Sequence, residues 1–566
     1  MVSPTPRHVG PRVFPNFPLF SKLLGYAARG DSIVIKDITN GFSATHAQLL
    51  TDVLNVRNVL LDSIDAQTEE ELQRGDEVFF NLLTPGGYEF TVGFLAILAI
   101  GGVIVPLSPA LPVKEATYFV QTSRAVAVLT ASKCVKLGQD LSAEVSRTVL
   151  PKYQSLELGP LVRRPPLAAE QMFISRDDFL DYNGSGLVIF TSGTTGPPKG
   201  AMRRRSFFDA YAQVFANMFY LGPNDVVMHN LPVHHVTGIG TSFLPYLVSG
   251  ACIEFHSGGF DVAKVWDRWR RKDLTLFSGV PTIYMRMMQY YEVHISKLPE
   301  KERQEYVDGV NNLRALMCGT AALPRPLQRK WLQLVPGKRI LERYGSTECS
   351  STFTIHPDDD KCPDGSVGKV VAGLDVKLSE GDTGEILIKS PYMFSKYIFN
   401  EKATADAFDA DGYYKSGDIG RREGDYFFIL GRASVDILKS GGYKISALDV
   451  EREVLGLDYI SEVAVVGVDD EEFGDRVAAA IVLKPVSSFQ QGRCGGIKSL
   501  TLDKLRQDLR SILAGYKMPT MLRIVPDLPK TASGKVPKKV LKPQLFPPQG
   551  HPDVQVWHSK KNLARL

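Results

Sequence analysis

Hydroxyl, glycine and lysine residues gather in one stretch, residues 188–202, which reads VIFTSGTTGPPKGAM. Three apolar β-forming residues come first, so we expect a buried strand that ends in a loop. Glycine leaves no side chain between the backbone and an anion, and N–H groups, hydroxyls and a lysine can converge on phosphate oxygens. The stretch therefore predicts a triphosphate-binding loop rather than a surface turn. Its candidate contacts are Thr191, Ser192, Gly193, Thr194, Thr195, Gly196 and Lys199.

The loop does not have the sequence of a Walker P-loop. In that motif the lysine is followed by Ser or Thr, whose hydroxyl binds a metal ion. Here Lys199 is followed by Gly200 and Ala201. Instead, residues 191–200 resemble the phosphate loop of the adenylate-forming superfamily, which includes acyl-CoA synthetases, luciferases and the adenylation domains of peptide synthetases. Further matches extend the resemblance over residues 20–540.

The resemblance implies that ATP is a substrate and that its adenine lies against two later segments. Residues 342–348, ERYGSTE, match the second signature of the superfamily, in which the aromatic ring of Tyr344, followed by Gly345, would face the purine. Residues 316–324 predict a strand followed by a turn of small residues. The residues of that turn that would cover the adenine are Gly319, Thr320 and Ala321.

The ribose and the metal are assigned by the same resemblance. Asp418, at the end of GYYKSGD, would accept hydrogen bonds from the ribose hydroxyls, and Arg432 would contact the nucleotide. Thr347 would hydrogen-bond the carboxylate or the α-phosphate. Glu348, together with Thr195, would hold Mg²⁺, which prefers oxygen ligands and joins protein carboxylates to phosphates.

A second group of matches lies near the C-terminus. Residues 529–538, PKTASGKVPK, resemble the terminal signature, which implies that Lys535 is the adenylation lysine. From the residues alone, Lys535 is one solvated lysine among several. Residues 429–445 resemble the interdomain hinge, with Ser434 at the pivot, where the superfamily usually carries Asp or Lys. The residues that would line a tunnel for the thiol of CoA are Lys439, Gly441, Gly442 and Lys444.

Two segments bear on the acid. Residues 230–240 read NLPVHHVTGIG, and the resemblance implies that His235, rather than His234, borders the carboxylate and acyl pocket. Arg286 follows Pro281 on a predicted helix, beside an apolar stripe. Malonyl-CoA synthetases resemble this stretch and use an arginine for the distal carboxylate, which suits a bidentate guanidinium pair. The alternative is an arginine whose charged end extends into solvent.

Strand-like and helix-like segments alternate over residues 31–276, which predicts an α/β fold with helices on the faces of mostly parallel sheets. Candidate strands are 32–35, 77–80, 125–129 and 252–255, and candidate helices are 44–64 and 262–271. Residues 92–106 predict a buried helix that turns at Gly101 and Gly102 into a strand. We expect a flexible head (1–18), a large AMP-binding domain (19–432), a smaller mobile α+β domain (433–545) and a tail (546–566).

Composition restricts the function classes. The 566 residues suggest at least two domains, and 44% hydrophobic and 23% charged residues are ordinary for a globular protein. A net charge of +4 gives no argument for nucleic acid. The six scattered cysteines favour reduced thiols over disulfides or zinc. The apolar run is too short to span a bilayer, so no transmembrane segment is expected.

The two ends suggest a compartment. The last residues, Ala564, Arg565 and Leu566, conform to a variant of the peroxisomal Ser-Lys-Leu address and would be read by an import receptor. The head carries Arg7 and Arg12 without acidic residues, but its prolines disfavour the amphipathic helix of a mitochondrial presequence. We therefore expect the peroxisome, with the cytoplasm or mitochondrion as alternatives.

The resemblance implies an AMP-forming acyl-CoA synthetase that uses ATP, Mg²⁺ and CoA and activates a carboxylic acid as its adenylate. Malonate or methylmalonate is the favoured acid. Alternatives are a short- or medium-chain fatty acid or an acid of secondary metabolism, an adenylating enzyme that loads a carrier protein, and a nucleotide-binding relative without catalysis. The last is disfavoured because the polar residues of every signature are retained.

Overall fold

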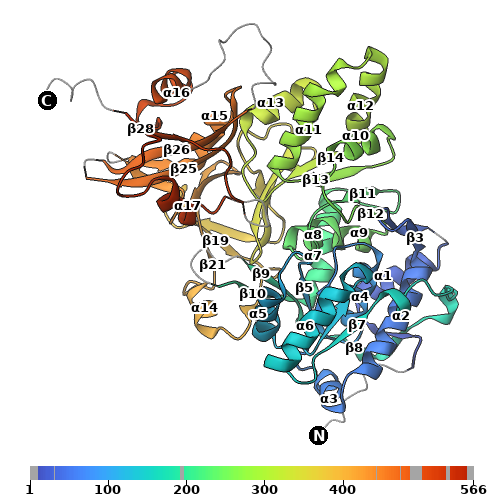
Figure 1. Ribbon diagram of the computed structural model, residues 1–566. Coiled ribbons are helices and arrows are strands. Elements are labelled where there is room, and N and C mark those ends of the chain that lie inside the picture. Colours follow the sequence, from blue (N-terminus) through green and yellow to red (C-terminus); the bar gives the residue numbers. More distant parts are fainter. Residues whose placement is uncertain are drawn as a thin grey trace, which may run out of the picture.

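The computed structural model describes residues 10–30, 32–191, 197–440, 443–471, 473–484, 500–530 and 536–557. Figure 1 shows a large part, coloured blue to yellow, and a smaller part, coloured orange to red, that lies beside the green helices. Within these ranges every helix is too short or too polar to cross a lipid bilayer.

The first sheet of the large part carries the predicted loop at one side. Its strand order is β20 (Lys396–Tyr397), β10 (Lys199–Arg204), β9 (Ser185–Thr191), β5 (Val103–Leu107), β4 (Phe79–Leu83), β6 (Ala127–Thr130) and β7 (Gln154–Glu157). The strands from β9 to β7 are parallel, and β10 turns back antiparallel to β9. Because β4 and β5 are buried along their whole length, this sheet is covered on both faces.

The second sheet brings several predicted segments to one edge. Its order is β17 (Lys369–Val370), β16 (Ser350–Thr354), β15 (Ile340–Ser346), β14 (Ala315–Cys318), β13 (Leu276–Gly279), β11 (Val226–His229), β12 (Cys252–Phe255), β2 (Ile33–Asp37) and β3 (Phe42–Thr45). The strands from β2 to β15 are parallel. Their carboxyl ends therefore lie along one edge, where ligands of open α/β sheets bind.

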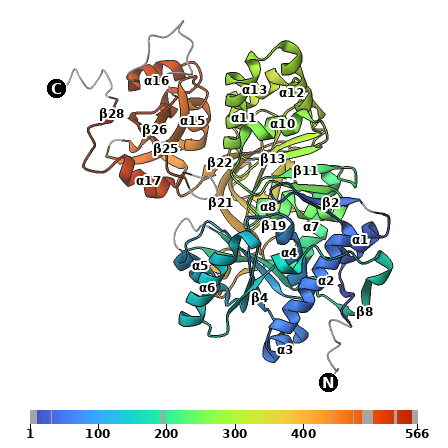
Figure 2. The same cartoon turned by 45° about the vertical axis from the view of Figure 1, so that its right-hand side comes forward.

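Helices fill the space around these sheets (Figure 2). The largest cluster of buried apolar side chains includes residues of both sheets and of the helices between them, α1 (Pro18–Ala27), α2 (His46–Ser63), α4 (Tyr88–Ala99), α7 (Ala210–Met218), α8 (Val236–Ser242) and α9 (Leu244–Ser249). A second cluster, centred on Trp266, Trp269 and Trp331, packs α10 (Val262–Arg270), α11 (Pro281–Val293), α12 (Glu300–Asn312) and α13 (Arg325–Leu334) against the second sheet. The outer helices of the first sheet are α3 (Ala66–Arg74), α5 (Val113–Ser123) and α6 (Val135–Thr148).

An antiparallel sheet connects the large and small parts of the chain. Its order is β18 (Asp375–Leu378), β19 (Thr383–Lys389), β21 (Tyr414–Glu423) and β22 (Tyr426–Arg432), and the short helix α14 (Glu401–Asp406) lies near its edge. The alternation of strands and helices upstream gave no sign of this sheet, because its strands pair antiparallel and do not form parallel strand–helix–strand units. It positions Asp418 and Arg432 next to each other, in register on β21 and β22.

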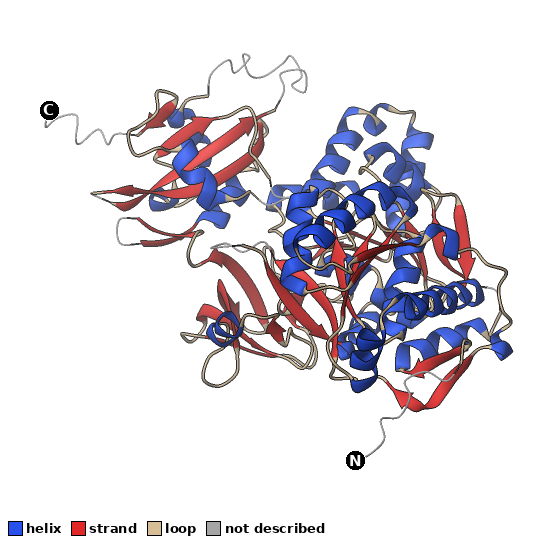
Figure 3. Cartoon of the chain, turned by 60° about the horizontal axis from the view of Figure 1, so that its bottom comes forward, coloured by secondary structure: helices blue, strands red, loops and turns tan. Residues whose placement is uncertain are grey.

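The small domain is an α+β layer, as expected (Figure 3). Its sheet contains β24 (Tyr443–Ser446), β23 (Ile437–Ser440), β26 (Gly474–Leu483), β27 (Met521–Ile524) and β28 (Val554–Val556), with β25 (Ile460–Asp470) also paired to β26. The two hydrophobic clusters on its faces are covered by α15 (Ala447–Val454) and α16 (Leu502–Leu509) and by α17 (Lys538–Leu545). Strand β28 pairs with β27, so packed structure continues past residue 545.

The predicted elements of the large domain lie close to their observed places. The helix expected at 44–64 is α2, and the run 92–106 forms α4 and β5 with a turn at Gly101. Of the head expected to be flexible, residues 1–9 lie outside the described residues, and the remainder is packed. Residues Val13–Asn16 form β1, which pairs in parallel with β8 (Phe173–Phe179), because Phe14 and Phe17 are buried and hold the segment against the core.

Candidate active site

The two ends of the predicted phosphate loop are held together by strand pairing. Thr191, the last residue of β9, is in register with Lys199, the first residue of β10, and its hydroxyl donates to the Lys199 carbonyl at 3.4 Å. The hydroxyl of Tyr118 on α5 donates to the carbonyl of Pro198 at 2.8 Å. Predictions for Ser192, Gly193, Thr194, Thr195 and Gly196 fall outside the described residues and stay predictions.

Lys199 and Glu348 are brought together by a tyrosine. The Nζ atom of Lys199 lies 5.1 Å from the ring centroid of Tyr397 on β20. The hydroxyl of that tyrosine donates to Oε1 of Glu348 at 2.8 Å, and the hydroxyl of Ser346 donates to Oε2 at 3.0 Å. The structure therefore joins the lysine of the phosphate loop to the carboxylate that the sequence assigned to a metal.

The Glu348 carboxylate has the properties expected of a Mg²⁺ ligand. It is 9% exposed, and no lysine or arginine among the described residues forms an ion pair with it. A buried carboxylate without a cation is costly unless a positive group arrives with the ligand. The described ranges contain no group of three side chains that could hold a metal unaided. One carboxylate plus substrate phosphates is the usual arrangement for Mg²⁺, so the residues fit this ion.

Thr347 is fixed through its backbone. Its carbonyl accepts a hydrogen bond from the guanidinium of Arg203 on β10, and the same guanidinium donates to the carbonyl of Tyr392 at 2.6 Å. Arg203 is fully buried, which lowers its pKa to about 10. The signature at 342–348 is thereby tied to the strand that follows the phosphate loop.

Tyr344, Asp418 and Arg432 form one hydrogen-bonded group. The Tyr344 hydroxyl donates to Oδ2 of Asp418 at 2.7 Å, and Nε of Arg432 donates to Oδ1 at 2.8 Å. Burial alone would lower the pKa of Arg432, but the charge of Asp418 raises it above its usual value. Each carboxylate oxygen keeps a second lone pair, so Asp418 can still accept from two ribose hydroxyls.

The predicted adenine turn lies beside this group. It follows β14, and Gly319 lies directly against the side chain of Arg343, the residue before Tyr344. Thr320 has a positive φ of 77°, and Ala321 is exposed. Gly345 stands where β15 and β16 approach so closely that a Cβ would lie 1.8 Å from the Ser350 carbonyl oxygen. The turn therefore lies beside β15, the strand that carries Tyr344.

The two residues predicted to bind the acid, His235 and Arg286, lie on elements outside the group formed by Tyr344, Asp418 and Arg432. His235 precedes α8, a helix that packs near β16, and its ring centroid is 4.6 Å from that of His234. Burial, with a smaller contribution from His235, lowers the pKa of His234 to about 3. Arg286 is exposed on α11, beside the buried Tyr284, Met287 and Met288. The described residues include no hydrogen-bond or ion-pair partner for Arg286, so the structure does not join it to Glu348.

The proposed CoA contacts lie on a hairpin of the small domain. Lys439 on β23 and Lys444 on β24 are direct cross-strand neighbours, and both are exposed. Two like charges placed opposite each other destabilise a hairpin unless an anion offsets them. Gly441, Gly442 and Lys535 lie outside the described residues, so their roles stay predictions.

Sequence reasoning missed Tyr397, Ser346 and Arg203. Tyr397 belongs to an extended segment far from any recognised signature, and its partner Glu348 is apparent only in the fold. Arg203 lies in the run Arg203, Arg204, Arg205, which suggests a solvated cluster. No local pattern separates Arg203 from its neighbours, because the four successive residues 200–203 of β10 are all buried.

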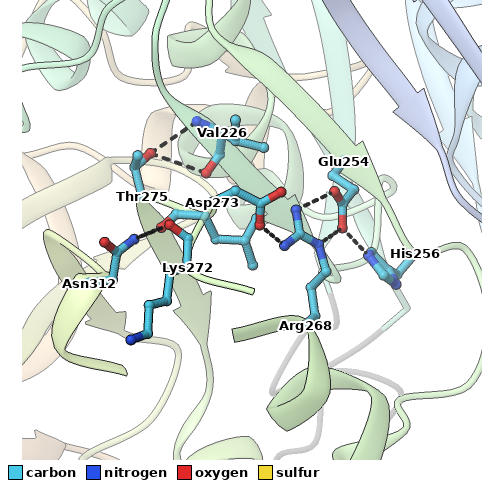
Figure 4. Close-up of polar contacts among 9 residues, drawn as sticks. Val226, Glu254, His256, Arg268, Lys272, Asp273, Thr275 and Asn312 are labelled. Atoms are coloured by element: carbon cyan, nitrogen blue, oxygen red, sulfur yellow. Dashed lines mark hydrogen bonds and ion pairs between the residues drawn. The ribbon is translucent and has the colours of Figure 1, made fainter. Parts of the chain in front are cut away.

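A separate buried ion network lies in the second sheet (Figure 4). The Glu254 carboxylate on β12 accepts from Nη2 of Arg268 at 2.8 Å and from Nε2 of His256 at 2.8 Å. Arg268, on α10, also binds Asp273. Burial would raise the pKa of Glu254, but these hydrogen bonds and the Arg268 charge lower it to about 2. Among the residues that the structure describes, no hydrogen bond or ion pair joins this network to Glu348 or Asp418, and we assign the network to stability.

Comparison with known proteins gives two matching family models. The model described as "AMP-binding enzyme" matches residues 26–398. The model described as "AMP-binding enzyme C-terminal domain" matches residues 449–535. The two matches correspond to the large part and the small domain described above.

Relatives and solved structures span nearly the whole chain. A CoA ligase of Gibberella moniliformis is 32% identical, over 91% of this chain and 93% of its own length. The mitochondrial malonate–CoA ligase ACSF3 of Bos taurus is 32% identical, over 82% of this chain and 81% of its own. The crystal structure of ATP-bound MatB from Rhodopseudomonas palustris is 25% identical and superposes with a TM-score of 0.77, over 93% of this chain and 98% of that one.

Proposed function

The chain belongs to the AMP-binding enzyme family as an ATP-dependent acyl-CoA synthetase, and we propose that it activates malonate or methylmalonate. The observation that carries this choice of acid is Arg286, an exposed guanidinium on α11 with no hydrogen-bond or ion-pair partner within the described residues. A dicarboxylate offers such a group a second carboxylate for bidentate pairing. The Bos taurus relative is named a malonate–CoA ligase, which supports the same choice.

In the proposed first step an oxygen of the acid attacks the α-phosphate of ATP. The bond from the α-phosphorus to the bridging oxygen breaks, and pyrophosphate leaves. Lys199 and the loop donors would offset the negative charge on the phosphates, and Lys535 would add a positive charge. When bound, Mg²⁺ would be held by Glu348 and would neutralise further phosphate charge. Thr347, whose carbonyl is fixed by Arg203, would orient the carboxylate or α-phosphate.

The proposed second step transfers the acyl group to CoA. The sulfur of the thiol, after losing its proton, attacks the acyl carbon and displaces AMP. Lys439 and Lys444 would attract the phosphates of CoA to the hairpin of the small domain. The superfamily resemblance implies that the small domain rotates about Ser434 between the steps, which removes Lys535 and admits the thiol.

The experiment measures the two steps separately. Purified protein with Mg²⁺ and ATP should exchange labelled pyrophosphate into ATP in the presence of malonate or methylmalonate, and addition of CoA should release AMP. Exchange that requires a short- or medium-chain monocarboxylic acid instead would overturn the choice of acid. No exchange with any acid would overturn the reaction itself. Acyl transfer to a carrier protein but not to CoA would favour the carrier-loading alternative.

The compartment is also a proposal. The tail that carries Ala564, Arg565 and Leu566 lies outside the described residues, so the peroxisomal address and its import receptor rest on sequence alone. The mitochondrial alternative has support from the name of the Bos taurus relative. Immunolocalisation of the untagged protein distinguishes the two compartments.

A further inference from the structure

The turn at the proposed hinge is closed by the side chain of Asp436. The backbone N–H of Arg432 donates to Oδ2 of Asp436 at 3.1 Å, and the N–H of Asp436 donates to the carbonyl of Arg432 at 2.7 Å. These two bonds enclose Ser434. Gly431, just before the turn, has a φ of 123°, and a Cβ there would lie 2.5 Å from Cβ of Asp436. The turn therefore requires both this glycine and this carboxylate.

The same carboxylate is held from the small domain by a buried lysine. The Nζ atom of Lys538, the first residue of α17, lies 2.6 Å from Oδ1 of Asp436 and 2.7 Å from Oε1 of Glu451 on α15. The side chains of Lys538, Asp436 and Glu451 are only 10%, 15% and 13% exposed. Glu451 also accepts from the N–H of Val465 at 2.6 Å. Burial alone would lower the pKa of Lys538, but the two carboxylates raise it, so the lysine stays charged.

Together these contacts form one continuous chain across the hinge. It begins in the large domain with the Tyr344 hydroxyl and passes through Asp418 to the side chain of Arg432. It continues from the backbone of Arg432 to Asp436 and ends at Lys538 and Glu451 in the small domain. The residues assigned to the ribose are thus connected, bond by bond, to the first turn of α17.

We propose that Lys538 is a positioning residue for Arg432: with Glu451 it holds the carboxylate of Asp436, and that carboxylate fixes the backbone of Arg432 across the hinge turn. The inference rests on the proposed function, because Arg432 and Asp418 are taken to contact the nucleotide. Without Lys538 the Asp436 carboxylate would be free to turn away. The guanidinium of Arg432 would then lose its fixed place beside Asp418, and nucleotide binding would weaken.

The test compares AMP binding by the full chain in two variants. Lys538→Met/Glu451→Gln removes one positive and one negative charge, so the net charge of the buried cluster is unchanged. Lys542→Met is the matched control, because Lys542 lies on the same helix and pairs with the exposed Asp469. Calorimetric titration gives Kd for AMP, and thermal unfolding reports whether each variant is folded.

We expect the double variant to unfold cooperatively and to bind AMP at least about fivefold more weakly than the wild type. The control should bind AMP as the wild type does. A folded double variant with the wild-type Kd would overturn the inference. If that variant does not fold, Asp436→Asn is judged by the same criterion, because Lys538 keeps Glu451 as its counter-ion. A wild-type protein that fails to bind AMP would overturn the proposed function, and this inference with it.

Discussion

The hydroxyl of Tyr397 donates a 2.8 Å hydrogen bond to Oε1 of Glu348. Tyr397 lies on β20 of the first sheet and Glu348 in the turn between β15 and β16 of the second, and the bond fixes the direction in which the carboxylate faces. Partners that orient a metal ligand typically change metal affinity or activity by about 10–100-fold when removed.

Tyr397→Phe should raise the concentration of Mg²⁺ needed for half-maximal ATP binding by about tenfold. The ring stays in place over Lys199, and the change removes only the hydroxyl, with its bond to Glu348 and its contact with Tyr414. Mg²⁺ titration of ATP binding, followed by calorimetry, measures the change. Tyr413→Phe is the control, because the Tyr413 hydroxyl binds Asp375 at the surface. An unchanged Mg²⁺ requirement in Tyr397→Phe would show that the tyrosine does not orient the carboxylate.

Lys535→Ala should abolish pyrophosphate exchange but leave intact the formation of thioester from supplied acyl-AMP. The lysine is needed only while the α-phosphate is attacked, since later the small domain carries it away. Lys539→Ala is the control, because Lys539 is exposed on α17 and belongs to the same basic segment. Equal loss of both half-reactions would contradict the role assigned to Lys535.

Arg286→Leu should lower kcat/KM for malonate by about 100-fold or more, because a hydrogen-bonded, charged partner of the distal carboxylate is removed. Activity with a monocarboxylic acid of similar size should not fall and could rise. Pyrophosphate exchange with a panel of acids measures both. Arg329→Leu serves as control, since Arg329 is exposed on the neighbouring helix α13. Unchanged use of malonate by Arg286→Leu would remove the case for a dicarboxylate.

Replacement of Lys439 and Lys444 together by Ala should raise KM for CoA by about tenfold and reduce its dependence on salt. Pyrophosphate exchange, which needs no CoA, should be unaffected. Steady-state kinetics at two ionic strengths measure the effect. Lys504→Ala, at an exposed pair with Asp508, is the control. A normal KM for CoA in the double variant would exclude this hairpin from CoA binding.

The Glu254 network should make stability depend on pH. Since the folded pKa of about 2 lies below the unfolded value, the carboxylate stabilises the fold above about pH 4.5, and this contribution is lost as the pH falls towards 2. The difference is of the order of 3 kcal/mol. Glu254→Gln should flatten the dependence measured by urea unfolding at pH 7 and pH 3.5.

The control for that measurement is Glu305→Gln. Glu305 pairs with Arg270 at a partly exposed site, where an ion pair contributes less than about 1 kcal/mol. Its unfolding should keep the wild-type pH dependence. If Glu254→Gln keeps it as well, the Arg268 network does not lower the pKa of Glu254.

The sequence predicted those parts of the site whose chemistry is local. A strand followed by hydroxyls, glycines and a lysine identified the loop at 188–202, and the matched signatures selected Tyr344, Glu348, Asp418 and Arg432, which the structure gathers into two neighbouring groups. The apolar run 92–106, broken at Gly101 and Gly102, predicted α4 and β5, although α4 begins four residues earlier, at Tyr88. Each of these signals is carried by residues that are close in the chain.

The contacts that join these segments could not be predicted in the same way. Tyr397 lies 49 positions from Glu348, and Lys538 lies 102 positions from Asp436. Nothing in the local pattern around Tyr397 or Lys538 distinguishes it from a surface residue, because the partner and the burial come from tertiary packing. The antiparallel sheet from β18 to β22 was missed although β19 alternates between buried and more exposed residues, because the sequence alone does not show which strands pair.

The buried guanidinium of Arg203 limits how this enzyme can be re-engineered. Because it binds the carbonyls of Thr347 and Tyr392, three distant pieces of chain share one interior charge. If the segment around Thr347 were replaced by that of a homologue, the Thr347 carbonyl would shift. The buried Arg203 guanidinium would then lose its correctly placed acceptor. Exchanges of segments between relatives should therefore succeed only when β10, residues 342–348 and the segment that leads into β20 are all taken from the same relative.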